Sequence, residues 1–159
     1  MAQDTDCRFD GLLALPREKA FSLFVDRLDL WWTSPFSEAV DGAVDGSIEP
    51  YPGGSCYEID ANGQHRVWGT VLSIEAPLYI RLAWQVSQDG REIADPATAS
   101  RVMVSFRQVG EATRLEIVHS EFLRHGEKGG EYLARMQQPE GWPRVVANLE
   151  KASRASGLR

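Results

Sequence analysis

The sequence predicts an α+β fold in which a curved antiparallel sheet of about six to seven strands wraps around a long C-terminal helix. Between residues 44 and 121, short runs of strand-forming residues alternate with turn signals. Trp142, Val145, Val146 and Leu149 then follow at positions i, i+3, i+4 and i+7, which is the apolar stripe of a helix. A β-rich body that ends in one amphipathic helix must bury this stripe against its sheet.

The beginning of the chain predicts one strand and two short helices. Residues 8–15 form the strand, and Pro16 suits the first turn of the helix that follows it. Apolar residues up to Phe24 continue with helical spacing. Residues 26–32 form the second helix, and Pro35 ends it because a proline disfavours helix at the residue before it.

The strands that follow are separated by Gly, Pro, Asn and Asp at the turns. Asn62-Gly63 and Gly110-Glu111 are typical of tight hairpins. The stretch 91–100 is predicted to be a longer hairpin loop. The six predicted strands cover residues 44–49, 54–60, 65–75, 78–88, 99–109 and 112–121.

Alternation along the later strands predicts which side chains face inward. Three of these strands each place apolar residues at every second position, and Arg81 and Gln85 fall on the opposite, solvent-facing side. In the 54–60 strand, either Cys56 and Glu58 or Ser55 and Tyr57 face inward, and the sequence leaves both arrangements open. The predicted inward residues of the other strands are Ile80, Leu82, Trp84 and Val86, then Val102, Val104 and Phe106, then Leu115, Ile117 and His119.

After the sheet, residues 126–130 are predicted to be a loop and residues 131–137 a helical turn or two. Pro139 interrupts the chain before the closing helix, which is predicted over about residues 140–156. Because repeats, low-complexity tracts and linkers are absent, residues 1–159 are expected to form a single domain.

Composition excludes several classes of function. The chain has 17 Lys and Arg against 23 Asp and Glu, a net charge of −6, which argues against a nucleic-acid partner. The acidic N-terminus is unlike a secretory signal, and no stretch approaches the ~18 continuous apolar residues of a membrane span. Two cysteines, Cys7 and Cys56, suit free thiols in a reducing compartment. We expect a cytoplasmic protein without a membrane association.

The order and spacing of a set of landmarks resemble the SRPBCC superfamily, the START-like or Bet v I-like proteins with a helix-grip fold. Within it, the chain is most similar to the branch of the activator of heat-shock-protein-90 ATPase homologue. The landmarks span residues 8–155. They are Leu30-Trp31-Trp32, Gly53-Gly54, Gly69-Thr70-Val71, Glu75-Ala76-Pro77, Leu82-Ala83-Trp84, Thr113-Arg114-Leu115, His119, Phe122, Gly141-Trp142 and Leu149.

This resemblance implies a hydrophobic cavity between the sheet and the last helix, and a small hydrophobic molecule as the partner. It implies neither a cofactor nor one particular activity, because a shared fold is weak support for a shared function. The chain departs from the usual pattern at Pro139 and Pro143, which should break or delay the closing helix. Cys56 stands where a large aromatic is commoner, which would enlarge the cavity.

The candidate ligand-binding residues are the aromatic and apolar side chains predicted to face this cavity. Trp84 and Trp142 are expected to face each other across the ligand, although each tryptophan could instead be ordinary core. The three histidines lie in separate segments without ligand spacing, so no metal site is expected. The complete set of candidates is Trp32, Cys56, Trp68, Leu82, Trp84, Val104, Phe106, Ile117, His119, Trp142 and Val146.

Two polar residues, His119 and Glu58, are the candidates for a catalytic role. A buried His119 can orient a ligand or move a proton near neutral pH, or it can be a structural histidine bonded to a backbone carbonyl or to the closing helix. An inward Glu58 would be a desolvated carboxylate and a candidate base.

Three functions are compatible with these residues. The first is binding of a small hydrophobic or aromatic ligand, such as a lipid or a polyketide-like compound. The second is a cyclase or hydrolase that uses His119 in the cavity. If the protein is not an enzyme, no residue is expected to be catalytic. The third is a chaperone-linked interaction module. The predicted start of the first strand near residue 8 argues against it, because this start leaves no room for a separate N-terminal domain. A homodimer through the outer sheet face is a further expectation.

Overall fold

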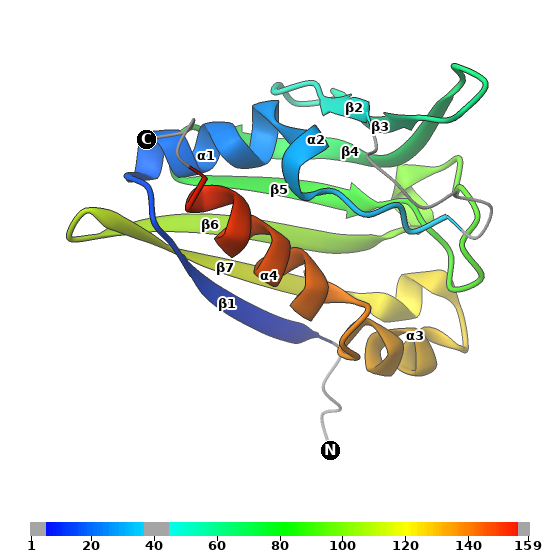
Figure 1. The fold of residues 1–159 in the computed structure, drawn as a ribbon. Helices are drawn as coiled ribbons and strands as arrows, with labels where there is room; N and C mark the ends of the chain where they lie inside the picture. Colours follow the sequence, from blue (N-terminus) through cyan, green and yellow to red (C-terminus); the bar gives the residue numbers. More distant parts are fainter. Residues whose placement is uncertain (1–5, 37–44, 156–159) are drawn as a thin grey trace.

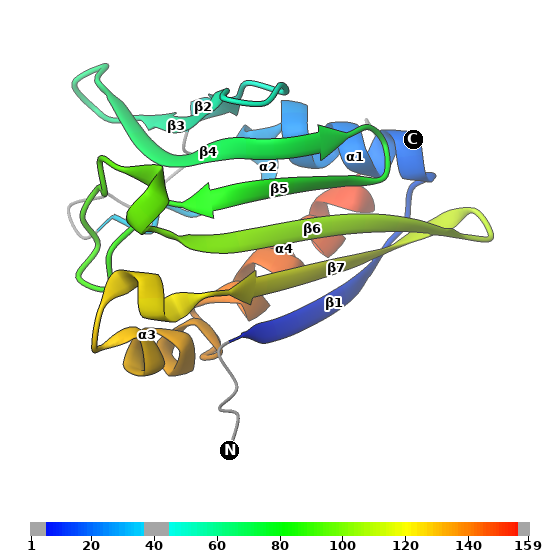
Figure 2. The same ribbon diagram turned by 180° about the vertical axis from the view of Figure 1, so that it is seen from behind.

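A computed structural model describes residues 6–36 and 45–155, and it has one seven-stranded antiparallel sheet with the order β1-β7-β6-β5-β4-β3-β2. The helices α1, α2 and α4 cover one face of this sheet (Figure 1), and none of the described helices covers its other face (Figure 2). The predicted helix-grip fold is confirmed. The elements are β1 Cys7–Leu13, α1 Arg17–Asp26, α2 Leu28–Trp31, β2 Asp45–Ile48, β3 Ser55–Ile59, β4 His65–Glu75, β5 Tyr79–Trp84, η1 Pro96–Thr98, β6 Ser100–Val109, β7 Ala112–Ser120, η2 Phe122–His125, α3 Gly129–Met136 and α4 Trp142–Ser153.

The closing helix α4 begins at Trp142, two residues after the predicted start, and Pro143 lies in its first turn. This position tolerates proline because the first-turn N–H groups have no acceptor within the helix. The predicted delay is confirmed at Pro139, which precedes the helix, whereas Pro143 neither breaks nor delays it. The helix is described to Ser153, and the predicted end at residue 156 lies outside the described residues, as does the predicted strand start at residue 44.

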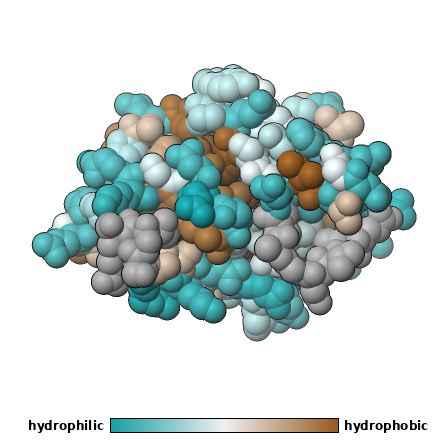
Figure 3. Space-filling model, turned by 45° about the horizontal axis from the view of Figure 1, so that its top comes forward, coloured by the Kyte–Doolittle hydropathy of each residue, from teal (hydrophilic) through white to brown (hydrophobic). Residues whose placement is uncertain are grey.

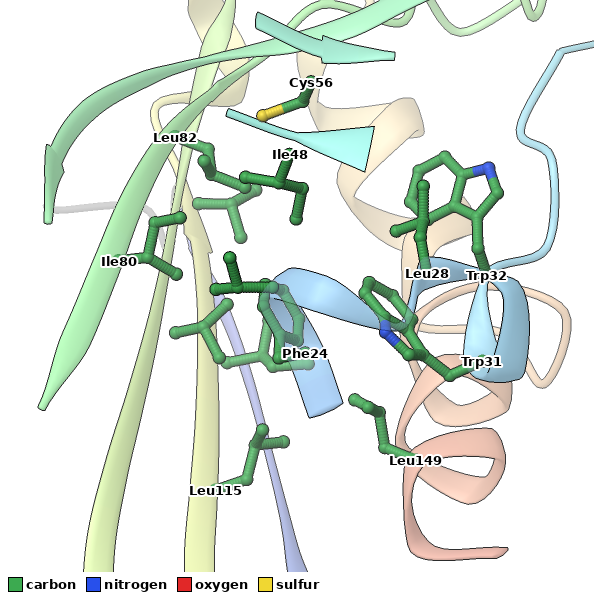
Figure 4. Close-up of a cluster of buried hydrophobic side chains, with 14 of the residues drawn as sticks. Phe24, Leu28, Trp31, Trp32, Ile48, Cys56, Ile80, Leu82, Leu115 and Leu149 are labelled. Atoms are coloured by element: carbon green, nitrogen blue, oxygen red, sulfur yellow. The ribbon is translucent and has the colours of Figure 1, made fainter. Parts of the chain in front are cut away.

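The inner face of the sheet carries the predicted apolar residues, and the predicted alternation of β5, β6 and β7 is confirmed there. Cys56 and Glu58 are the inward pair of β3, since both are buried. In Figure 4, Phe24 of α1 lies in the middle of the core, between Ile80 and Leu115 of the sheet and the helix residue Leu149.

The outer face differs from the prediction at Gln85. Its side chain was expected to meet solvent, but it is buried. The strand β5 ends at Trp84, and the following stretch folds back so that Val86 pairs with Glu92. The side-chain amide of Gln85 donates to the carbonyl oxygen of Ile93 at 2.9 Å, so this connection covers it.

No helix within residues 6–36 and 45–155 is long and apolar enough to cross a membrane.

Candidate functional site

A pocket of about 410 Å³ opens at one end of the sheet, beside the N-terminal end of α4. Its walls come from four stretches: residues 32–36 after α2, the end of β5 and the residues after it, one side of α3, and residues 138–145. On the face drawn in Figure 3, hydrophobic residues are visible between the hydrophilic ones, in the middle of that face.

Three of the predicted ligand-binding residues line this pocket: Trp32, Trp84 and Trp142. Their rings form one continuous wall. The ring centroids of Trp84 and Trp142 are 5.2 Å apart, and those of Trp32 and Trp84 are 6.2 Å apart. Rings at these separations contact each other directly. The expectation that Trp84 and Trp142 face each other across a ligand is therefore wrong, because no ring fits between them.

The other eight candidates do not line the pocket. They lie in the packed core, where each side chain is at most 8% exposed. Between the sheet and α4, where the cavity was predicted, side chains of α1 and α2 fill much of the space, such as Phe24 and Trp31, whose stacked rings have centroids 4.6 Å apart. The eight residues are Cys56, Trp68, Leu82, Val104, Phe106, Ile117, His119 and Val146.

Each indole N–H of the pocket wall donates to an acceptor of the protein. Trp32 Nε1 donates to Glu58 Oε1 at 2.9 Å, and Trp84 Nε1 donates to the hydroxyl oxygen of Tyr132 at 2.8 Å. The hydroxyl of Tyr132 in turn donates to the carbonyl oxygen of Val86 at 2.6 Å, and burial raises the pKa of this hydroxyl. The Trp32 and Trp84 side chains therefore offer the pocket aromatic carbon, and their polar atoms are occupied.

The third indole belongs to a buried chain of hydrogen bonds. Trp142 Nε1 donates to Nδ1 of His119 at 2.9 Å, and Nε2 of His119 lies 2.6 Å from the hydroxyl oxygen of Ser100. This hydroxyl is also 2.6 Å from Nε2 of His125. The indole N–H can only donate, so Nδ1 of neutral His119 accepts and Nε2 carries the proton. His119 then donates to Ser100, and Ser100 donates to His125.

Both imidazoles are held in their neutral form. Burial lowers the pKa of His125 to about 4. Burial, with the nearby His125 as the smaller cause, lowers the pKa of His119 well below 6.5. His119 is completely buried, both of its nitrogens are engaged, and it binds Trp142 of the closing helix. Its geometry is that of the structural alternative, in which it fixes the orientation of a pocket residue.

Glu58 faces inward and lies directly behind the pocket wall. Its side chain is only 4% exposed. Oε1 accepts from Trp32, and Oε2 accepts from the hydroxyl of Ser34 at 2.8 Å. Ser34 lines the pocket, so one hydrogen bond connects the carboxylate to the pocket wall.

Sequence reasoning missed the pocket residues that lie on α3 and on the segments between helices and strands. On α3, Tyr132, Arg135 and Met136 follow helical spacing, and all three line the pocket. This spacing is a signal that could have identified them. Ser34 carried no such signal, because its role depends on a partner 24 residues away. Among the described residues, no group of three or more His, Cys, Asp or Glu side chains could hold a metal ion.

Comparison with known proteins identifies the family. The family model described as "Activator of Hsp90 ATPase homolog 1-like protein" matches residues 14–154. The chain belongs to this family. No curated protein sequence matches it.

Solved structures share the fold of this family member over nearly its whole length. An anthrahydroquino-gamma-pyrone synthase is 26% identical, with a TM-score of 0.65, and the match covers 96% of this chain and 99% of that one. The self-sacrificing resistance protein CalC from Micromonospora echinospora is also 26% identical, with a TM-score of 0.64 and 94% of each chain covered. An AHSA1 protein from Silicibacter pomeroyi is 23% identical, with a TM-score of 0.61 and coverages of 92% and 95%. This last likeness is one of fold alone.

Proposed function

We propose that the pocket binds a small apolar molecule with a planar aromatic ring system. The observation that carries this proposal is the tryptophan wall, in which every indole N–H already donates to a protein acceptor. Such a wall offers aromatic surface, on which a ligand ring packs by offset stacking or edge contact. The volume of about 410 Å³ lies in the range of about 300–1,000 Å³ that is usual for small-molecule sites.

The comparisons support an aromatic ligand. One neighbour at 26% identity is named as a synthase of an anthrahydroquino-gamma-pyrone, a compound of fused rings. Whether this chain also catalyses a reaction is a separate hypothesis. His119 does not line the pocket, so the geometry favours binding over the predicted role of His119 as a catalyst. The chaperone-linked module, the homodimer, the cytoplasmic location and the absence of a nucleic-acid partner stay predictions.

A ligand panel tests the proposed function. The panel contains naphthalene, anthracene and anthraquinone derivatives, with a saturated fatty acid for comparison. At a ligand concentration 100 times Kd, binding to the folded state alone adds about 2.7 kcal/mol to the free energy of unfolding, which raises Tm by roughly 5–10 °C. We expect such a rise, together with a change in tryptophan fluorescence, for at least one aromatic compound.

A pair of variants on α3 locates the binding site. Met136 lines the pocket, whereas Ala134 is exposed on the same helix and does not. Met136→Trp should occupy the pocket and weaken binding at least tenfold, and Ala134→Trp should bind like the wild type. If the whole aromatic panel leaves Tm unchanged, or if Met136→Trp binds normally, the proposal is wrong.

A further inference from the structure

The hydroxyl of Ser34 is a polar group of the pocket wall, and Glu58, which lies behind the wall, determines where its proton points. Its oxygen is 2.8 Å from Oε2 of Glu58, and the other carboxylate oxygen accepts from Trp32. Glu58 is buried and does not itself line the pocket. Two donors of the pocket wall therefore converge on one buried carboxylate, which is how a protein accommodates such a charge away from water.

This arrangement makes Ser34 an acceptor toward the ligand. A carboxylate accepts hydrogen bonds and has no proton to donate, so the proton of the Ser34 hydroxyl points to Glu58. The oxygen can still accept hydrogen bonds, and among residues 6–36 and 45–155 only the backbone N–H of Phe36 reaches it, at 3.3 Å. A ligand that meets Ser34 therefore finds an acceptor, with its negative character increased by the carboxylate behind it.

Other elements supply groups of the opposite kind. Arg135 on α3 and Arg144 on α4 line the pocket, and a guanidinium group can only donate. Glu140 lines it as well. The pocket thus has an acceptor in the 32–36 segment, donors on α3 and α4, and a second acceptor, Glu140, between these two helices, so the wall offers a ligand's polar groups different partners at different places.

We propose that Ser34, held by Glu58, is a subsite that accepts a hydrogen bond from a hydroxyl group on the aromatic ligand, such as a phenol. This proposal rests on the proposed function and specifies the class of ligand. A phenol satisfies Ser34, whereas a methyl ether or a ketone at the same position brings one acceptor against another. A neutral hydrogen bond is worth about 0.5–1.5 kcal/mol, so a phenol should bind up to about tenfold more tightly than its methyl ether.

The test compares 2-naphthol with 2-methoxynaphthalene, by calorimetric titration at neutral pH. The wild type should prefer the phenol by about twofold to tenfold. Ser34→Ala should bring the ratio of the two Kd values close to one without weakening the ether. Thr33→Val is the matched control, because Thr33 is the neighbouring hydroxyl residue and also lines the pocket, and this variant should keep the wild-type ratio.

Glu58→Gln tests the direction of the Ser34 proton. The indole N–H of Trp32 can only donate, so the side-chain amide oxygen of the variant accepts from it. The amide NH₂ then faces Ser34 and donates to its hydroxyl oxygen. The Ser34 hydroxyl then turns to the pocket as a donor. We expect the preference for 2-naphthol to disappear and the binding of 2-acetylnaphthalene, which only accepts, to improve several-fold.

The outcomes separate the two proposals. If none of the naphthalenes binds the wild type, the aromatic-ligand function fails and this subsite fails with it. If they bind but the wild type does not discriminate, or if Ser34→Ala or Glu58→Gln retains the preference for the phenol, only the subsite is wrong. If Thr33→Val abolishes the preference, the acceptor is Thr33 and the assignment to Ser34 is overturned. Circular dichroism spectra verify that each variant is folded.

Discussion

At the scale of residues, the hydrogen-bond chain through Ser100 joins two histidines, His119 and His125, that are neutral in the folded protein. Nδ1 of His125 must carry the proton, because Nε2 accepts from both the hydroxyl and the backbone N–H of Ser100. Protonation of His119 would place a second donor against the indole N–H of Trp142, so it would break the contact that orients a residue of the pocket. The orientation of Trp142 therefore depends on neutral histidines.

This dependence predicts acid sensitivity. In the unfolded chain a histidine takes up its proton near pH 6.5, whereas in the folded protein the pKa of His125 is about 4 and that of His119 is well below 6.5. Below pH 6.5 the unfolded state binds more protons, so the contribution of both groups to stability is complete above pH 6.5 and is lost as the pH falls toward 4. Urea unfolding at a series of pH values measures this loss of stability.

The variant His125→Gln separates this effect from the titration of carboxylates. It removes one of the two imidazoles and keeps an oxygen that accepts from Ser100. The free energy of unfolding of the variant should fall less steeply between pH 6.5 and 4 than that of the wild type. Equal slopes for the two proteins would show that His125 does not contribute.

At the scale of elements, the contact between α4 and β1 closes the sheet against the helix. The strand β1 is an edge of the sheet, and α4 supplies acceptors to backbone N–H groups at and just after the end of this strand. Leu12 N donates to the Glu150 carboxylate at 3.1 Å, and Ala14 N donates to the Ser153 hydroxyl at 2.9 Å. A covered edge is protected from pairing with other chains. The helix can come this close because Gly11 has no side chain.

The close approach at Gly11 predicts the cost of adding a methyl group. A Cβ there would lie 2.7 Å from Cγ1 of Val146 and 3.2 Å from the Glu150 carboxylate. Gly11→Ala should therefore destabilise the protein by about 1–3 kcal/mol, the usual range for overpacking. Chemical denaturation measures this loss.

A second substitution tests the mechanism of that loss. Val146→Ala removes the methyl group that the new Cβ would meet, so Gly11→Ala should cost less in this background by at least about 0.5 kcal/mol, the usual size of coupling between contacting residues. If the two effects simply add, the contact with Val146 is not the cause.

At the scale of the whole molecule, all five tryptophans form one contiguous cluster. Trp31 contacts Trp32 at 5.7 Å between ring centroids, and Trp32 stacks on Trp68 at 4.1 Å. Trp84 contacts Trp68 at 5.8 Å and Trp142 at 5.2 Å. The cluster connects α2, β4, β5 and α4, so the pocket wall is continuous with the core and shares its stability.

This continuity predicts one cooperative unfolding transition. Tryptophan fluorescence reports the cluster, and far-ultraviolet circular dichroism reports the helices and the sheet, so the two should give the same midpoint in urea. Two separate midpoints would indicate that the tryptophan cluster opens independently of the sheet.

The strand alternation, the helical stripe and the turn residues predicted most of the elements, because these signals are local. The faces of β5 to β7 were predicted correctly on this basis, and the start of α4 was predicted to within two residues. Gln85 was not, since its burial comes from a connection that folds back over it. The cavity was predicted between the sheet and the closing helix, and the structure has a pocket beside the N-terminal end of that helix.

The sequence by itself predicted the α+β fold and the inward side chains of β5 to β7, because periodicity and turn residues are local signals, and the resemblance of its landmarks indicated the family. Only the tertiary structure decided where a hollow is left. A hollow depends on the volumes that side chains from distant elements occupy together, and Phe24 of α1 fills the space that the strands and the closing helix alone would leave open. The acceptor character of Ser34 was decided in the same way, since it depends on Glu58, which lies on the distant strand β3.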